Sequence, residues 1–275
     1  MCIRDSDRIE RETGLVIPLA ALFEDDTIAG LARAFREGRP GLDAPIVMLN
    51  EGGTLPPLVF LHGDLVGGFY CRRLAHLLGP DQPVAAVHPH GIDAAPIPET
   101  IEAMAADRIR ALRAQRPRGP YVLGGFCNGA FVAFEMARQL TEQGERVPAV
   151  IVIEARAPAG ARSSGPSAAG ERYVTFDRDG GFRVLAPHDR RSDEHLRYTR
   201  AMDRYAGGPY AGHIVVVRSG GLDDARPDLG WAGFAASTEV HVLPGDHVTV
   251  VTRHIDRLAS VTRQAIDHAL GGIAR

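Results

Sequence analysis

Cysteine is scarce in this chain, with three residues in 275: Cys2, Cys71 and Cys127. They lie far apart in the sequence, so they predict neither a disulfide framework nor a zinc site. Thiols that stay unpaired are typical of a reducing compartment, and we therefore expect a cytoplasmic protein. The N-terminus also lacks the basic and then apolar pattern of a secretory signal, which agrees with that expectation.

Long apolar runs and a surplus of one charge are absent as well. The longest apolar runs, such as Ala149–Ile153, hold five residues, whereas a membrane-spanning helix needs about 20. The 31 basic and 34 acidic residues leave a formal net charge of −3, which gives no reason to expect nucleic acid or an anionic membrane as partner. With 45% hydrophobic residues, the chain can bury one α/β domain of ordinary size plus a small extra piece.

The beginning of the chain predicts helices only. Apolar residues recur at helical spacing in Leu19–Phe23 and Thr27–Ala32, and Thr27 is a suitable N-cap for the second helix. A linker rich in Gly, Pro and Asp follows at Glu37–Pro45. We therefore divide the chain into a helical piece at 1–37, a linker at 38–45 and a main domain at 46–275.

From Ile46 onward, short apolar runs alternate with helical patterns, which is typical of a mainly parallel sheet covered by helices on both faces. The predicted strands are Leu58–Leu61, Val84–Val87, Tyr121–Leu123, Val150–Ile153, Ile214–Val217 and Val240–Leu243. The predicted helices include Thr100–Gln115, Ala130–Leu140 and Ile255–Leu270.

One segment, Ala155–Gly208, interrupts this alternation. It holds a stretch rich in Gly, Ser, Ala and Pro and then a polar helical pattern at Asp193–Tyr205, with little that predicts a strand. A long excursion between core strands commonly forms a lid or a binding loop. We expect a helical lid at about 155–208.

The most informative segment is Gly125-Phe126-Cys127-Asn128-Gly129. It has the pattern Gly-x-nucleophile-x-Gly, with cysteine where most enzymes of this pattern carry serine. A predicted strand leads into it and a predicted helix leads out. A strained turn at this place would lift the Cys127 side chain above the sheet edge, at a helix N-terminus that favours thiolate. The alternative is a buried structural cysteine after a core strand.

A catalytic thiol needs a base nearby, because only a few per cent is thiolate at pH 7. In a nucleophile elbow this base is a histidine after the last strand, and an acid lies between the two in chain order. Of the eleven histidines, only His247 combines a loop after a predicted strand with a position shortly before the terminal helix. We predict that His247 activates Cys127, the alternative being a solvated loop histidine.

Glu154 is the acid that the pattern favours. It ends the predicted strand Val150–Ile153, so its carboxylate should emerge at the same sheet edge as Cys127. An ionisable group at the end of such a strand is costly unless it is paired, and an imidazole would be its natural partner. A salt bridge of Glu154 with Arg156 or Arg162 is the structural alternative.

Other acids compete with Glu154 for this role. Asp223 or Asp224 follows the strand Ile214–Val217, at the place where many α/β-hydrolases keep their acid. Asp228 is a third, weaker option. We favour Glu154 because it directly follows the strand–helix unit of the elbow.

An acyl-transfer site also needs donors for the oxyanion. We predict the backbone N–H groups of Asn128, which follows the nucleophile, and of Asp64, in the glycine-containing loop after the first predicted parallel strand. The Asp64 carboxylate would oppose a developing negative charge. It therefore caps the helix that starts at about Phe69, or it contacts a substrate amine.

Three further residues have less specific interpretations. Cys71 lies on the helix after the glycines, where we expect core packing. His88 and His90 follow a strand end and either line the pocket or are solvated. We expect no zinc site there, because no acid or cysteine lies at ligand spacing nearby.

Several segments beyond the elbow are specific in combination. They are Leu61-His62-Gly63, Arg73-Leu74-Ala75, Arg116–Tyr121, Leu123–Cys127, Ala133–Leu140 and Pro244–His247. Through them, most of residues 46–270 resembles the thioesterase domains that terminate nonribosomal peptide and polyketide synthases.

This resemblance implies an α/β-hydrolase fold with a lid and a triad of Cys127, His247 and Glu154. Cysteine at the nucleophile is a minority pattern in the family, and glutamate in place of aspartate shifts the carboxylate by about 1.5 Å, one C–C bond length. The resemblance implies no cofactor bound by the domain itself.

The helical piece at 1–37 resembles the tail of an acyl or peptidyl carrier domain, through Ile17–Phe23 and Thr27–Ala32. By that pattern the serine that carries phosphopantetheine would lie before residue 1, and Ser6 does not match it. We therefore expect the chain to be the C-terminal fragment of a longer synthase, with the upstream carrier domain as its partner.

The expected function is the release of a carrier-bound acyl or peptidyl chain through an acyl-S-cysteine intermediate, by hydrolysis or by intramolecular cyclisation or aminolysis. A stand-alone esterase of small acyl substrates and a non-catalytic module that binds carrier domains are the alternatives.

Overall fold

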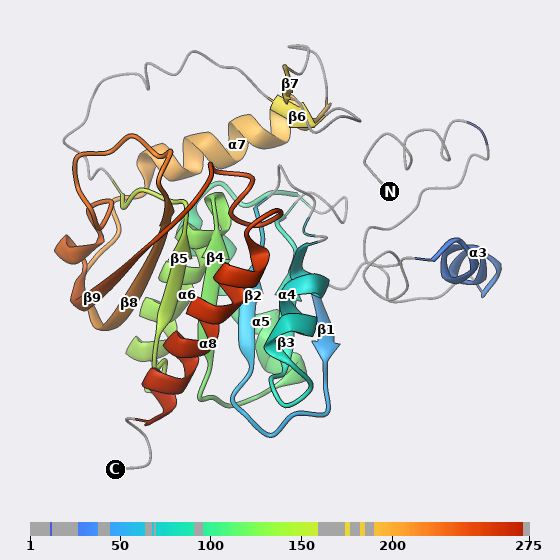
Figure 1. Ribbon diagram of the computed structural model, residues 1–275, viewed down its shortest axis with the longest axis horizontal. Coiled ribbons are helices and arrows are strands. Elements are labelled where there is room, and N and C mark those ends of the chain that lie inside the picture. The colour runs from blue at the N-terminus through green and yellow to red at the C-terminus, as the bar shows by residue number, and fades with distance from the viewer. Residues whose placement is uncertain are drawn as a thin grey trace.

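The computed structural model describes residues 12, 27–37, 45–63, 68, 70–90, 96–158, 174–176, 182–184 and 190–271. The main body is a seven-stranded sheet with helices on both faces (Figure 1). Its strands are β1 (Ile46–Asn50), β2 (Leu58–Leu61), β3 (Val84–Val87), β4 (Val122–Phe126), β5 (Val150–Ile153), β8 (Tyr210–Ser219) and β9 (Ala235–Leu243).

The strands lie in the order β1-β3-β2-β4-β5-β8-β9. All neighbouring pairs are parallel except β1 and β3, which run antiparallel. Because β2, β4 and β5 are parallel neighbours, the loops that follow them emerge at one edge of the sheet. The prediction of a mainly parallel sheet covered on both faces is confirmed.

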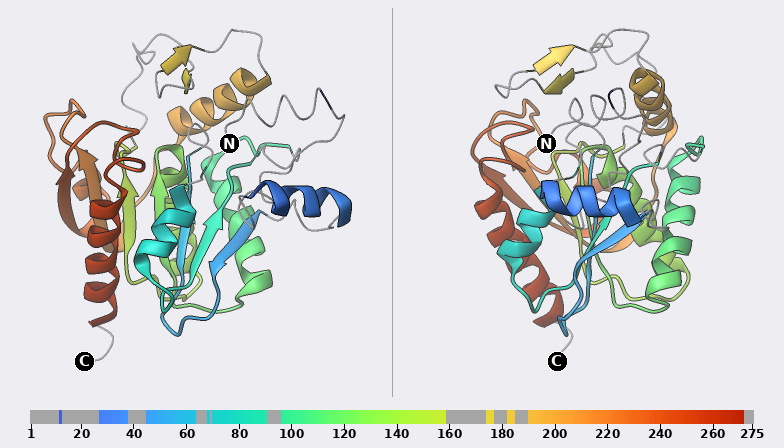
Figure 2. Two further views of the ribbon diagram at one scale, coloured as in Figure 1. Left: turned by 45° about the vertical axis from the view of Figure 1, so that its right-hand side comes forward. Right: turned by 90° about the vertical axis from the view of Figure 1, so that its right-hand side faces the viewer.

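Each face of the sheet is covered by a pair of helices that pack against each other (Figure 2). Helices α4 (Tyr70–Leu78) and α8 (Ile255–Gly271) cover one face, and α5 (Ile101–Gln115) and α6 (Asn128–Glu142) cover the other. Side chains that alternate along the buried strands therefore enter two separate cores. The predicted helix Thr100–Gln115 corresponds to α5, whose apolar residues at helical spacing are buried: Ile101, Met104, Ala105, Ile109 and Leu112.

Helix α7 (Arg190–Arg204) crosses above the carboxyl ends of the strands, on the side where α8 begins (Figures 1 and 2). It matches the helix predicted at Asp193–Tyr205. The same excursion contains a short antiparallel hairpin, β6 (Val174–Phe176) and β7 (Phe182–Val184), which the sequence did not predict.

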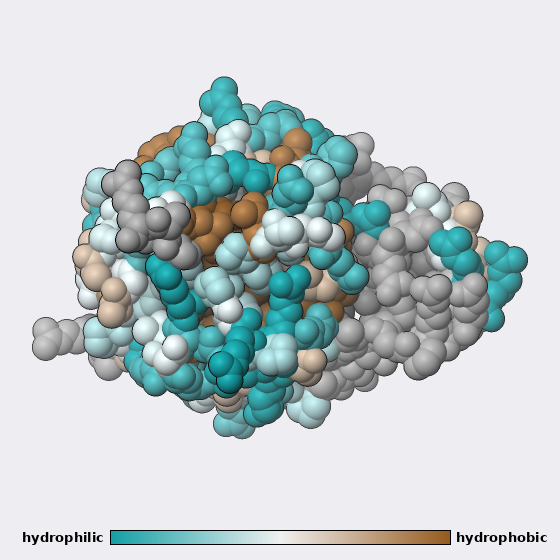
Figure 3. All heavy atoms as spheres, turned by 90° about the horizontal axis from the view of Figure 1, so that it is seen from below, coloured by the Kyte–Doolittle hydropathy of each residue, from teal (hydrophilic) through white to brown (hydrophobic). Residues whose placement is uncertain are grey.

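The end of the molecule opposite to α7 is mostly hydrophilic and has a hydrophobic patch near its centre (Figure 3).

Helix α3 (Ile28–Glu37) agrees with the predicted helix and its cap, since the Gly30 N–H donates to Thr27 Oγ1 at 2.9 Å. The helix expected at Leu19–Phe23 and most of the expected linker lie outside the described residues. Within the described part of the chain, every helix is too short or too polar to cross a bilayer.

Candidate active site

Cys127 lies on a strained turn between β4 and α6. Its φ of 55° and ψ of −126° are unusual for a residue with a side chain. The turn leaves no room for further side chains, since a Cβ added to Gly125 would lie 2.5 Å from the carbonyl oxygen of Gly129. The geometry of a nucleophile elbow is therefore present as predicted.

The Cys127 side chain is partly exposed at the N-terminus of α6, and its thiol is not in a disulfide. Cys71, in contrast, is fully buried in the core between α4 and the sheet, as expected, and burial raises the pKa of its thiol.

His247 lies in the loop after β9, which the neighbouring Asp246 organises. The Asp246 carboxylate accepts hydrogen bonds from the backbone N–H groups of Val248 and Thr249, at 3.1 and 2.9 Å. These bonds, led by that of Thr249, lower the pKa of Asp246, so its charge holds the turn near neutral pH. The His247 ring packs on Phe126 with ring centres 4.8 Å apart.

The structure brings Cys127, His247 and Glu154 together. The His247 ring lies close enough to the Cys127 side chain for that group to raise the pKa of the ring, and its Nδ1 lies 3.4 Å from Glu154 Oε2. Cys127 emerges after β4, Glu154 after β5 and His247 after β9, so the cluster depends on the parallel register of the sheet. This order along the chain is the one that the sequence predicts.

The charge state of His247 follows from these contacts. Partial burial opposes the charged ring, but the hydrogen bonds with Cys127 and Glu154 outweigh it and raise the pKa of His247 to about 10. The ring therefore keeps its proton at neutral pH. A protonated imidazole beside a thiol can stabilise the thiolate and later protonate a leaving group.

Glu154 is held by a second residue that the sequence analysis did not single out, Ser219 at the end of β8. The Ser219 N–H donates to Glu154 Oε1, and its hydroxyl donates to Oε2 at 3.1 Å. Both residues are buried, and Glu154 has a positive φ of 53°. A polar residue that ends a buried strand next to Glu154's strand was the available signal, but only the register of β5 with β8 brings the two together.

Two of the rival carboxylates, those of Asp224 and Asp228, are engaged elsewhere. The Asp224 carboxylate pairs with Arg156 at 2.9 Å and with Arg226 at 3.2 Å, and Arg156 also donates to the Asp223 carbonyl. Asp228 accepts from the backbone N–H of Ala232 at 2.7 Å. The alternative partner Arg156 is thus committed to Asp224, and Arg162 lies outside the described residues.

Of the two predicted oxyanion donors, only Asn128 lies within the described residues. Asn128 is the first residue of α6, directly after Cys127, so its backbone N–H lies where a donor is expected. Asp64 lies outside the described residues, and so does Phe69. The Asp64 donor and the role of its carboxylate therefore stay predictions.

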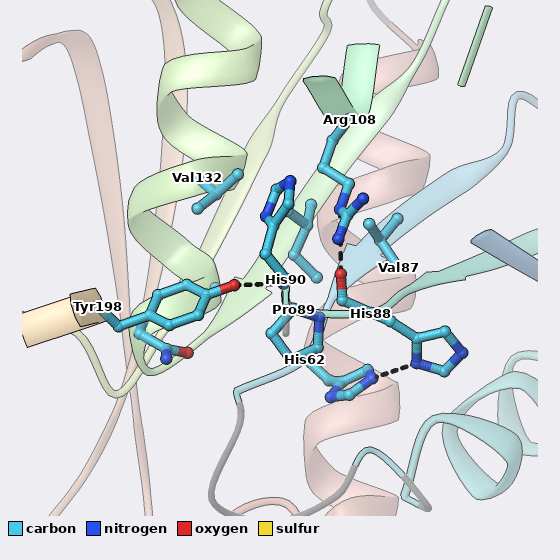
Figure 4. A pocket seen from close by; sticks show the side chains of 11 residues that line it. His62, Val87, His88, Pro89, His90, Arg108, Val132 and Tyr198 are labelled. Atoms are coloured by element: carbon cyan, nitrogen blue, oxygen red, sulfur yellow. Dashed lines mark hydrogen bonds between the residues drawn. The ribbon is translucent and has the colours of Figure 1, made fainter. Parts of the chain in front are cut away.

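His88 and His90 are buried beside the elbow rather than solvated. They line a small cavity with His62, Arg108 and Tyr198, and His62 Nε2 lies 2.9 Å from His88 Nδ1 (Figure 4). Burial, the neighbouring His62 and the charge of Arg108 lower the pKa of His88 to about 3, so that ring stays neutral. The described residues form no cluster of three ligand side chains that could hold a metal ion.

Comparison with known proteins now identifies the family. A model of the thioesterase domain matches residues 56–205, more than half of the chain. The chain belongs to the thioesterase domain family. It is 26% identical to the chondramide synthase of Chondromyces crocatus over an alignment that covers 97% of this chain. It is 34% identical to a dimodular nonribosomal peptide synthase of Bacillus subtilis over an alignment that covers 56% of this chain. The chain spans 8% and 7% of the lengths of these relatives.

Solved structures support the fold of this thioesterase domain. The NocB thioesterase domain from the nocardicin cluster superposes with a TM-score of 0.64 and 24% identity, covering 81% of this chain and 99% of that one. A four-domain nonribosomal peptide synthetase bound to AMP and glycine gives a TM-score of 0.69 at 24% identity, covering 94% of this chain and 23% of that one. The fold is that of the α/β-hydrolases, as the resemblance implied.

Proposed function

We propose that this thioesterase domain releases an acyl or peptidyl chain from a phosphopantetheinyl carrier domain, with Cys127 as nucleophile, His247 as acid and base, and Glu154 as the acid that orients His247. The observation that carries the proposal is the contact of one imidazole with both the Cys127 thiol and the Glu154 carboxylate, on the strained turn of a nucleophile elbow. Membership of the thioesterase family and the similarity to peptide synthases support the substrate class.

The first half of the reaction forms the acyl-enzyme. The Cys127 thiolate attacks the thioester carbonyl, and the backbone N–H groups of Asn128 and Asp64 stabilise the oxyanion. The carbon–sulfur bond to phosphopantetheine breaks, and the departing thiolate takes the proton of the His247 imidazolium. The chain is then bound to Cys127 as a new thioester, and His247 is neutral.

The second half regenerates the enzyme. Neutral His247 takes a proton from water, or from a nucleophile within the bound chain, as that group attacks the acyl-S-Cys127 carbonyl. Collapse of the intermediate releases the product and restores the Cys127 thiolate and the protonated ring. The Glu154 carboxylate stabilises the ring whenever it is charged.

Cysteine at the nucleophile favours some acceptors over others. Transfer between two thioesters is nearly thermoneutral, so the acyl-enzyme keeps its activation. Amines compete with water more effectively at thioesters than at oxygen esters. We therefore propose that the domain forms an amide bond or closes a ring in preference to plain hydrolysis.

Product analysis tests this function. A carrier domain loaded with a peptidyl thioester that bears an internal amine should yield cyclic product with the wild type and none with Cys127→Ala, whose fold and thermal stability should be nearly unchanged. Linear acid alone, from both wild type and Cys127→Ser, would remove the preference for ring closure.

The same experiment separates the alternatives. Turnover of simple nitrophenyl esters with no turnover of the loaded carrier would favour a stand-alone esterase. Binding of the carrier without any turnover would favour a non-catalytic module.

A further inference from the structure

Asn128 has a side chain that its surroundings do not explain. It is 2% exposed, and neither Oδ1 nor Nδ2 has a hydrogen-bond partner among the described residues. A buried polar group without a partner destabilises a folded chain, so a native structure that keeps both ends of an amide in this state needs a reason. The backbone N–H of Asn128 is part of the proposed oxyanion site, but that role does not depend on the side chain.

Asn128 is one of the residues that line the cavity beside the elbow. The other polar groups there are engaged with one another: His62 with His88, and Arg108 with the His88 carbonyl at 3.1 Å (Figure 4). The Tyr198 hydroxyl accepts from the His90 backbone N–H. The Asn128 amide is therefore the group in this wall whose donors and acceptor are available to a ligand.

Tyr198 belongs to α7, the helix that crosses the carboxyl edge of the sheet, so this helix contributes part of the cavity wall. The cavity leaves about 10 Å³ for the centre of a water molecule, which admits one water and no larger group. A substrate amide that binds Asn128 therefore needs more room than the cavity has in this arrangement.

We propose that the Asn128 side chain determines specificity by binding a secondary amide that lies close to the thioester. This inference rests on the proposed function. A side-chain amide offers both a donor and an acceptor, and a secondary amide offers the complementary pair. Asn128 is the residue next to the nucleophile, and consecutive Cα atoms are about 3.8 Å apart. Its side chain can therefore bind only an amide that lies near the reacting carbonyl carbon.

Two parts of the substrate carry such an amide. One is the first peptide bond of a peptidyl chain, on the acyl side of the thioester. The other is the amide of the phosphopantetheine arm nearest the sulfur, on the thiol side. Both present the same chemistry to Asn128, and they can be distinguished with synthetic thioesters.

The experiment compares four thioesters in wild type and Asn128→Leu. Peptidyl and alkyl acyl groups of equal length are each joined to N-acetylcysteamine, which has the amide, and to a plain alkanethiol, which lacks it. We expect the ratio of kcat/KM between the amide-bearing and amide-free members of one pair to fall roughly tenfold in the variant. A fall in the acyl pair identifies the peptide bond, and a fall in the thiol pair identifies the phosphopantetheine arm.

An active wild type whose ratios are the same in the variant would overturn the inference and leave the proposed function intact. A wild type that turns over none of the four would refute the proposed function and this inference with it.

A stability measurement decides independently of turnover. Leucine has the branched shape of asparagine without its polar atoms, so Asn128→Leu should raise the thermal unfolding midpoint by removing an unpaired buried amide. A midpoint several degrees lower would mean that the amide already has a structural partner, and this outcome would overturn the inference as well.

Discussion

Ser219 provides the sharpest test of how the proposed triad is held. Ser219→Ala removes one hydroxyl, which donates to Glu154 Oε2 at 3.1 Å, and leaves the backbone N–H bond to Oε1 in place. The Oε2 atom that loses this donor is the one 3.4 Å from His247 Nδ1. The substitution therefore loosens the contact between the acid and the imidazole without touching either residue.

The size of the effect follows from the environment of the bond. Ser219 is 0% exposed, so water does not replace the lost donor. A hydrogen bond to a buried charged group contributes about 1.5–3 kcal/mol. If half of this appears in the transition state, when the ring must be oriented, kcat/KM should fall roughly three- to tenfold.

The pH dependence gives a signature that a general loss of stability would not produce. The pKa of His247 is raised to about 10 because its hydrogen bonds with Cys127 and Glu154 outweigh the opposing effect of burial. The protonated ring is lost as the pH rises through that pKa. Weakening the Glu154 contact lowers the pKa of His247, so the alkaline limb of the kcat/KM profile should move to lower pH in Ser219→Ala.

The assay is the kcat/KM profile from pH 6 to 11 with one synthetic thioester, for wild type, Ser219→Ala and Ser219→Thr. Threonine keeps the hydroxyl and should restore most of the wild-type profile. Ser260→Ala is the matched control, because the Ser260 hydroxyl donates at 3.0 Å to a backbone carbonyl on an exposed part of α8. An alkaline limb that does not move in Ser219→Ala would refute the reasoning.

Two further substitutions test the elbow and the choice of acid. Gly125→Ala places a Cβ 2.5 Å from the Gly129 carbonyl oxygen and should lower the free energy of unfolding, measured by denaturant titration, by roughly 1–3 kcal/mol. Gly52→Ala is the control, because its Cβ would meet nothing within 4 Å and the free energy of unfolding should not fall. Equal effects of the two substitutions would contradict the packing argument. Asp224→Asn should change kcat less than twofold while Glu154→Gln lowers it at least tenfold, and the reverse order would return the acid's role to Asp224.

Much of the fold could be predicted because the central strands are short and wholly apolar. Leu58–Leu61, Val84–Val87 and Val150–Ile153 are buried on both faces, so each stands out as an uninterrupted run. β9 begins at Ala235, well before the predicted start at Val240. The prediction missed these earlier residues because they are exposed or half-buried and do not form an apolar run. The edge strand β1 was missed, since only its first residue is fully buried.

The residues of the proposed triad could also be predicted, because chain order and strand ends suffice to place them. The residues that surround the proposed triad could not be predicted from the sequence. Ser219 meets Glu154 only through the register of β5 with β8. His90 contacts Asp107 of α5, 17 residues further along the chain, and Tyr198 of α7, 108 residues further along. No local sequence pattern contains the second of these pairings.

The pairing of Cys127 with His247 is tested most directly by the pH dependence of alkylation at Cys127. Iodoacetamide labelling, read by peptide mass spectrometry, should be fast near pH 6 in the wild type, while buried Cys71 serves as an internal control that stays unlabelled. In His247→Ala the labelling of Cys127 should slow at least tenfold at pH 6 and recover only at higher pH. Identical profiles for the two proteins would contradict the account.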